Sequence, residues 1–257
     1  MNQNFKFIFV FFILCSGQTF SQMAGKGNFY KEIKNYDLSK IIDPKSILTE
    51  DRENTKEKMQ KAEPIGFIGD DYQRLYIHYN SINKNPKNPY EYLVKGKTKV
   101  KNTVRSFEGK LLIKKANIEK NSDFPNYQQG FATCELILNE DKNLTSTGFF
   151  KGVITVGYII DPKNNFRYDA LMFYADIFSN NEFKGTWTSY KTKISKKCNW
   201  GDYRIPNSGD LDIGAGEFMP NPKYLDKGWK YYTLTMYGEP KNDVELARKK
   251  EEMNWWK

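Results

Sequence analysis

From Ile65 onward, apolar and polar residues alternate in short runs that are separated by turn-forming residues. This period of two is typical of strands that bury one face. Runs of this kind are centred on Tyr76 and Cys134 and also cover 148–161, 166–178 and 183–191. Because short turns join them, the pattern predicts an antiparallel meander of about eight strands.

The meander is expected to close on itself, because closure removes the exposed edges of a long sheet. A small repeat supports this: a phenylalanine stands two residues before a glycine at Phe107, Phe150 and Phe183. An inward-facing ring followed by a glycine suits a bend where a sheet curls over its core. We therefore expect a mostly β fold whose meander closes into a barrel.

Two flanking regions differ from this pattern. Residues 23–64 are polar and charged, and we expect an N-terminal arm with a helix that begins at Thr49 and ends before Pro64, since acidic residues in a first turn suit the helix dipole. Together they would form a helical strap. The barrel domain would then cover 65–240, with a long loop at 196–229 and a final strand from Gly228 to Gly238.

The chain is expected to end in a C-terminal helix at 241–257 with Asn242 or Asp243 as its N-cap. Trp255 and Trp256 stand at its end. We expect these rings to dock on the body of the protein, and a terminal interaction hook is the alternative.

The first 22 residues have the features of a signal peptide. A single charge at Lys6 precedes an apolar run from Phe7 to Cys15, which is too short to span a bilayer, and small residues follow up to Ser21. We expect cleavage near Ser21 or Gln22 and an exported protein, periplasmic or extracellular. Lipid attachment at Cys15 is an alternative that Leu14 argues against.

Composition adds limits to the possible partners. The formal net charge is +9, but the lysines are scattered without a run of five, which argues against nucleic-acid binding. A solvated lysine surface explains the charge, and anionic glycans or lipopolysaccharide are alternative partners. No segment after the N-terminal run reaches the ~18 consecutive apolar residues of a membrane span.

Two cysteines remain after the signal peptide, Cys134 and Cys198. In an oxidising compartment they could form a disulfide, which would stabilise the fold by roughly 4 kcal/mol. The alternative is that Cys134 is a small core residue of its strand.

The segment GTWTSY at Gly185–Tyr190 resembles the Gly-x-Trp signature of calycin-type barrels, the group of lipocalins and avidins. The resemblance implies a calycin-like barrel with a ligand pocket. In lipocalins the signature lies on the first strand, whereas here it comes near the end of the meander. Residues 183–218 also resemble a recurrent segment of uncharacterised exported bacterial proteins, which implies no activity.

Several kinds of catalytic chemistry lack their residues. His78 is the single histidine, so a Ser-His-Asp or Cys-His mechanism would depend on it alone. The sequence contains no CxxC pair, phosphate-binding P-loop or GxGxxG dinucleotide motif. We expect no cofactor, with calcium as the alternative discussed next.

The stretch KCNWGDYRIPNSGDLDIGAGEF, 197–218, concentrates the remaining polar chemistry. One interpretation is an ordered loop that braces the sheet, in which Trp200 and Tyr203 bury their rings and Arg204 pairs with an aspartate. A second is a calcium site, because hard oxygen ligands gather at Asn207, Asp210, Asp212 and Glu217. A third is a glycosidase pair formed by Asp212 and Glu217.

The sequence favours a binding function over these alternatives. We expect an exported binding protein that holds a small apolar or glycan ligand at the barrel mouth or loop 196–229. Stacking surfaces are expected at Trp187, Trp200, Tyr203 and Trp229, and polar contacts at Arg204, Asp210 and Asp212. The alternatives are a carbohydrate-cleaving hydrolase that uses Asp212 and Glu217, and a structural or inhibitory envelope protein with a filled barrel and a protein partner.

Overall fold

The computed structural model describes residues 25–53, 55–120, 122, 124–238 and 241–257, so the expected signal peptide lies outside the described residues. The N-terminal elements are β1 (Gly25–Asn28), α1 (Tyr30–Ile33), α2 (Ser39–Ile42), β2 (Ser46–Glu50) and β3 (Lys56–Gln60). The main strands are β4 (Ile65–Ile68), β5 (Gln73–Asn85), β6 (Asn88–Val100), β7 (Thr103–Glu119), β8 (Gln128–Glu140), β9 (Gly148–Ile160), β10 (Phe166–Tyr168), β11 (Asn180–Ser189) and β12 (Ser195–Asp202). The C-terminal elements are the 3₁₀ helices η1 (Gly209–Leu211) and η2 (Pro222–Lys227), then α3 (Lys230–Tyr237) and α4 (Lys241–Glu251).

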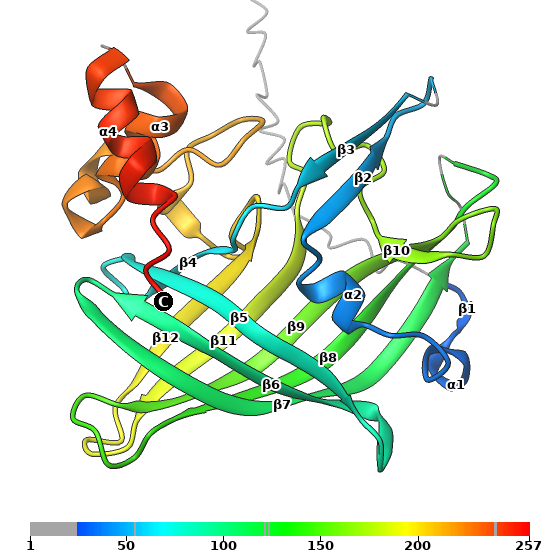
Figure 1. Ribbon diagram of the computed structural model, residues 1–257, viewed down its shortest axis with the longest axis horizontal. Coiled ribbons are helices and arrows are strands. Elements are labelled where there is room, and N and C mark those ends of the chain that lie inside the picture. The colour runs from blue at the N-terminus through cyan, green and yellow to red at the C-terminus, as the bar shows by residue number, and fades with distance from the viewer. Residues whose placement is uncertain (1–24, 54, 121, 123, 239–240) are drawn as a thin grey trace, which may run out of the picture.

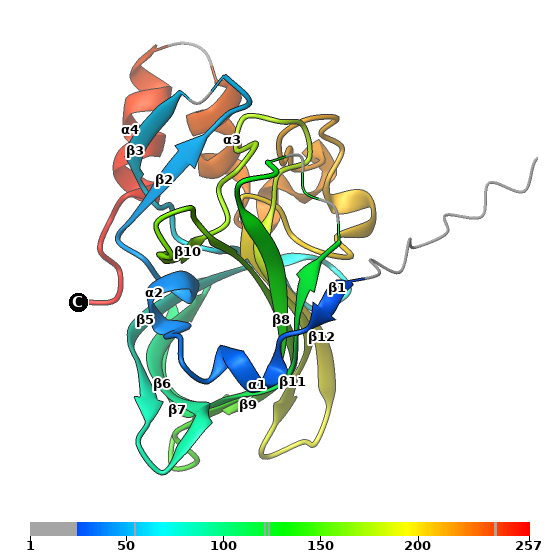
Figure 2. The ribbon, with the colours of Figure 1, turned by 90° about the vertical axis from the view of Figure 1, so that its right-hand side faces the viewer.

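The described strands form a mostly β, antiparallel structure that closes on itself (Figures 1 and 2). The ring runs in the order β4, β5, β6, β7, β8, β9, β11, β12, and β12 pairs back with β4. The closing pairs join Cys198 to Ile68 and Gly201 to Ile65. The expected meander and its closure into a ring are confirmed.

The interior of the ring is filled by side chains that alternate inward. In β8 the buried positions are Ala132, Cys134, Leu136 and Leu138, each separated by a residue that faces outward. Large buried rings meet them from the other strands: Tyr92, Phe107, Phe150, Tyr158, Phe183 and Trp200. The core therefore lies inside the ring.

Two glycines of the phenylalanine-glycine repeat, Gly152 and Gly185, make room for the ring of Phe183. Gly185 of β11 pairs with Gly152 of β9, and the ring of Phe183 lies over both. A Cβ on Gly185 would stand 2.5 Å from that ring, and a Cβ on Gly152 would stand 2.7 Å from it. Phe107 lies in the same way over Gly96 of β6, where the corresponding distance is 2.5 Å.

The N-terminal strap covers one end of the ring, where α1 and α2 lie across the opening (Figure 2). Its apolar side chains, Ile33, Leu38, Ile41 and Ile42, belong to the buried core. The backbone N–H of Leu38 donates to the Tyr92 hydroxyl at 2.9 Å, and Asn181 donates to the carbonyls of Ile41 and Ile42.

The helix expected from Thr49 to before Pro64 is wrong, because β2 and β3 form an antiparallel hairpin there. Glu50 is 2 % exposed at the end of β2, where it accepts a hydrogen bond from the Tyr127 hydroxyl and pairs with Lys56 at 3.1 Å. The extended hairpin brings Glu50 to Tyr127, which is distant in the sequence. Contacts of this kind override the local helical pattern of the segment.

The strand expected at 228–238 is also wrong, because α3 occupies most of that segment. β12, the strand that precedes this segment, already pairs with β11 on one side and with β4 on the other, so the segment cannot extend the sheet beside it. The C-terminal helix is present as α4, and the tail behind it packs on β5, where Trp256 stacks on His78 with ring centroids 4.0 Å apart. No helix of the described residues is long and apolar enough to cross a membrane.

The proposed disulfide is absent, and Cys134 and Cys198 are buried free thiols. Cys134 lies on β8 and Cys198 on β12, with β9 and β11 between them in the ring. Neighbouring strands are about 4.8 Å apart, so this separation exceeds the roughly 7 Å between Cα atoms that a disulfide can bridge. Cys134 is a core residue, as the alternative interpretation proposed.

Candidate functional site

The segment 197–218 begins on β12 and continues as a loop that is held by its own side chains. Arg204 contacts one carboxylate oxygen of Asp212 through Nε at 3.1 Å and Nη2 at 2.5 Å. The same guanidinium donates to the carbonyls of Gly214 and Gly216. The other oxygen of Asp212 accepts the backbone N–H groups of Gly214 and Met219. Both Asp212 oxygens are therefore engaged in holding the loop.

The other three residues of the calcium alternative, Asn207, Asp210 and Glu217, do not form a ligand set with Asp212. Asp210 pairs with Lys223 and accepts a hydrogen bond from Tyr224 at 2.9 Å. Glu217 is exposed, and Asn207 has a positive φ of 51°. Among the described residues, no group of three or more His, Cys, Asp or Glu side chains is arranged to hold a metal ion. The four residues of the calcium alternative are thus not assembled into such a group.

Two of the expected stacking surfaces are covered by protein. Trp200 is 1 % exposed inside the ring, where it stacks on Phe183 with centroids 3.7 Å apart and donates from Nε1 to the Tyr79 hydroxyl. Trp229 is fully buried in a second cluster outside the ring, beneath the guanidinium of Arg74. Both rings serve packing, and the expectation that they form a rim is corrected.

The other two aromatic candidates are half-buried. Trp187 of β11 donates from Nε1 to the Glu140 carboxylate at 3.0 Å. Tyr203 packs edge-on against Phe173 at 4.9 Å and also contacts Phe178. The four aromatic residues of the expected stacking surface therefore lie in different parts of the molecule.

A buried polar cluster joins the strap to the ring and has no signal in the sequence. Lys61 and Asp202 form an ion pair at 2.8 Å, with side chains 2 % and 0 % exposed. Asp202 also accepts hydrogen bonds from Tyr168 and Asn181. Burial raises the pKa of Asp202 and opposes the effect of Lys61, which lowers it. The cluster fixes the closing end of β12.

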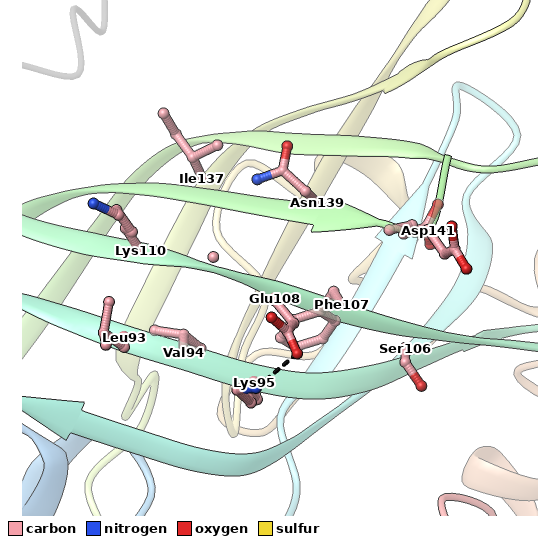
Figure 3. A pocket seen from close by; sticks show the side chains of 12 residues that line it. Leu93, Val94, Lys95, Ser106, Phe107, Glu108, Lys110, Ile137, Asn139 and Asp141 are labelled. Atoms are coloured by element: carbon pink, nitrogen blue, oxygen red, sulfur yellow. Dashed lines mark hydrogen bonds and ion pairs between the residues drawn. The ribbon is translucent and has the colours of Figure 1, made fainter. Parts of the chain in front are cut away.

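The outer surface of the ring has a groove across β6, β7 and β8 (Figure 3), which we call the β6–β8 groove. It has a volume of about 860 Å³. Leu93 and Ile137 provide apolar surface, and Lys95 pairs with Glu108 at 2.7 Å within it. Lys110 also lines it and is paired with Glu91 at 3.2 Å, so both lysines of this groove already have carboxylate partners.

A second groove lies on the outer side of β8, β9 and β11, beneath residues 169–180, and we call it the β8–β11 groove. Its volume is about 470 Å³. The apolar lining comes from Phe131, Leu171, Met172, Ala175, Ile177 and Phe178, and the charged lining from Glu119, Asp169, Asp176 and Glu182. Among the residues that the structure describes, no lysine or arginine lines it, although the chain has 40 of them.

Asp169 is the most strongly perturbed acid of the β8–β11 groove. Burial raises its pKa to about 6, even though Gln129 donates a hydrogen bond to it at 3.2 Å. The negative field of Glu119 raises this pKa further, and burial raises the pKa of Glu119 itself. The groove therefore contains a carboxyl group that changes charge near neutral pH.

The overhanging segment is fastened to the sheet through Asn180. Its side-chain oxygen accepts the N–H of Gly157 at 2.7 Å, and its amide donates to the carbonyl of Gly157 at 3.0 Å. A Cβ at position 157 would stand only 3.0 Å from the Asn180 oxygen, which explains the glycine. The segment is thus tied directly to β9.

The same segment carries backbone strain at its exposed lip. Met172 and Ile177 have φ angles of 58° and 63°, in the left-handed region that β-branched residues avoid. Ile177 is 67 % exposed, and its backbone is held by a hydrogen bond to the carbonyl of Gly216. Such strain is concentrated at ligand sites in proteins.

Sequence reasoning missed the β8–β11 groove because its residues are spread from 119 to 182 and share no motif. The Phe-Gly pattern indicated the curved sheet, but no local signal linked Asp169 to Phe131. A scan against protein-family models finds no match, and comparisons with curated proteins and with solved structures also find none.

Proposed function

We propose that this chain is an exported binding protein on a calycin-like barrel, and that a small ligand occupies the β8–β11 groove. The main observation in support of this proposal is that apolar walls and several carboxyl groups line one groove of about 470 Å³. Concave sites with mostly apolar walls and a few convergent polar groups are typical of small-molecule binding.

Because side chains fill the interior of the ring, we place the ligand on the outer face of the ring. Trp200, Phe183 and Phe150 pack against one another within the ring, and all three are nearly inaccessible. A lumen packed with rings has no volume for a ligand unless the core rearranges. This favours the outer groove over the barrel mouth of the original expectation.

The lining indicates the ligand's chemistry. Phe131 and Phe178 offer apolar surface to a flat group, and Glu119, Asp169 and Glu182 accept hydrogen bonds. The ligand therefore joins an apolar group to hydroxyl or amine donors, as an aryl glycoside or an arylalkyl amine does. Among these, an amine gains additional attraction from the acidic lining.

Both carboxylate oxygens of Asp212 are already bound by other groups of the loop. This favours a binding function over the alternative of a hydrolase that uses Asp212 and Glu217. A general acid or nucleophile needs a carboxyl group that is free to reach substrate. Arg204 and two backbone N–H groups engage both Asp212 oxygens instead.

Calorimetric titration with phenyl β-glucoside and with benzylamine tests the proposal. Thr155→Trp, which places an indole in the groove, should abolish binding, and Lys151→Trp on the exposed outer face of the same strand should leave it unchanged. Binding that survives Thr155→Trp would refute this location. Release of phenol from the glucoside would instead assign a hydrolase.

A further inference from the structure

Two hairpin turns at one end of the ring form a continuous surface, which we call the paired-turn surface. It consists of the β8–β9 turn, 141–147, and the β11–β12 turn, 190–194, together with Lys196. The N–H of Tyr190 donates to the carbonyl of Thr147 at 3.0 Å, and Lys142 lies 5.3 Å from the Tyr190 ring centroid. These contacts hold the two turns side by side, at the lower left of Figure 1.

The exposed charges of this surface are mostly positive. Lys142, Lys191, Lys193 and Lys196 are all exposed. Asp141 is the acidic residue of these turns, and its carboxylate accepts the N–H of Asn143 at 2.9 Å. Arg105 of β7 adds a further cation, because its guanidinium donates to the carbonyl of Thr145.

Two aliphatic side chains project among these lysines. Leu144 is 49 % exposed on the first turn, and Ile194 is 60 % exposed on the second. Both turns are fixed internally: Thr147 donates to the carbonyl of Leu144, and Ser189 donates its N–H to the carbonyl of Ile194. The apolar side chains are therefore presented on ordered turns.

We propose that the paired-turn surface docks on an anionic lipid bilayer. Lysines around exposed aliphatic groups match the interface of such a bilayer, because the ammonium groups meet phosphates while Leu144 and Ile194 enter between headgroups. A soluble polyanion would use the lysines but would leave the two aliphatic side chains in water. Their position between the lysines is what favours the bilayer.

Sedimentation with sucrose-loaded vesicles tests this docking, with phosphatidylcholine alone compared against phosphatidylcholine containing phosphatidylglycerol. The protein should bind the anionic vesicles and be released at high salt, because screening weakens exposed charges. Replacing Lys142, Lys191, Lys193 and Lys196 by glutamine should weaken binding by at least about a hundredfold, since each lysine near such a surface contributes about fivefold.

Two further variants serve as a control for the charge of the lysines and as a test of the insertion of the aliphatic side chains. Lys87→Gln with Lys163→Gln removes exposed lysines from turns at the opposite end of the ring and should leave binding unchanged. Leu144→Ser with Ile194→Ser should weaken vesicle binding about tenfold with every charge kept. Unchanged binding after the four lysine substitutions would overturn the proposal. Binding to dextran sulfate without binding to vesicles would overturn it as well and would assign a polyanionic glycan.

Discussion

Arg204 and Asp212 are joined by two contacts to a single carboxylate oxygen, at 3.1 and 2.5 Å, with side chains 17 % and 5 % exposed. The pair fixes the loop that follows β12, because Arg204 also binds the carbonyls of Gly214 and Gly216. This geometry supports the interpretation of the loop as a brace.

Arg204→Ala should lower the free energy of unfolding by about 3 kcal/mol, because Asp212 would keep a largely buried charge without its partner. Urea denaturation measures the loss. Lys223→Ala removes the exposed partner of Asp210 and should change stability by less than about 1 kcal/mol. Equal losses from the two substitutions would contradict the assigned role of Arg204.

Trp200→Ala should lower the free energy of unfolding by about 4 kcal/mol, since it empties a position in the packed ring. Trp255→Ala, in the partly exposed tail, should cost less than about 1 kcal/mol. Thermal or urea unfolding of both variants makes the comparison. A small loss at Trp200 together with weaker ligand binding would restore its original assignment as a stacking surface.

Asp169 should make stability fall as the pH rises. Its pKa is raised to about 6 in the folded protein, so the folded state holds this proton more tightly than the unfolded chain does. Its stabilising contribution is complete below about pH 4 and is lost as the pH rises through 6. Asp169→Asn should flatten the dependence over that range, as measured by unfolding at a series of pH values. An unchanged slope would contradict the assignment.

The Lys61–Asp202 pair should show strong coupling. Lys61→Met or Asp202→Asn alone leaves an unpaired polar group in a buried site and should cost about 3 kcal/mol. The double variant should lose less than the sum of the single losses. Additive losses in a double-mutant cycle would show that the two groups do not stabilise each other.

The ring strands were predictable because their inward positions alternate with outward ones. β8 keeps this period from Gly130 to Leu138, and two glycines of the Phe-Gly repeat, Gly152 and Gly185, lie under the ring of Phe183. The β2–β3 hairpin was not predictable, since Glu50 depends on Tyr127, 77 residues away. The segment 228–238 has strand-forming residues, but β12, the strand before it, is already paired with both β11 and β4.

The candidate site was harder to predict from the sequence than the fold was. Arg204 and an aspartate could be paired by their proximity in the chain, and the structure has that pair. Trp200 carries no local sign that it points into the ring. Asp169 and Phe131 meet only because β8 and β9 are neighbours and the segment after β10 returns over them.

The location of the ligand in the β8–β11 groove is tested by titrating benzylamine into the unmodified protein, Thr155→Trp and Lys151→Trp. Benzylamine should bind the unmodified protein and Lys151→Trp, and it should not bind Thr155→Trp, which keeps its fold. Binding that is equal in all three proteins, or absent from the unmodified protein for both benzylamine and phenyl β-glucoside, would contradict the assignment of the β8–β11 groove as the ligand site.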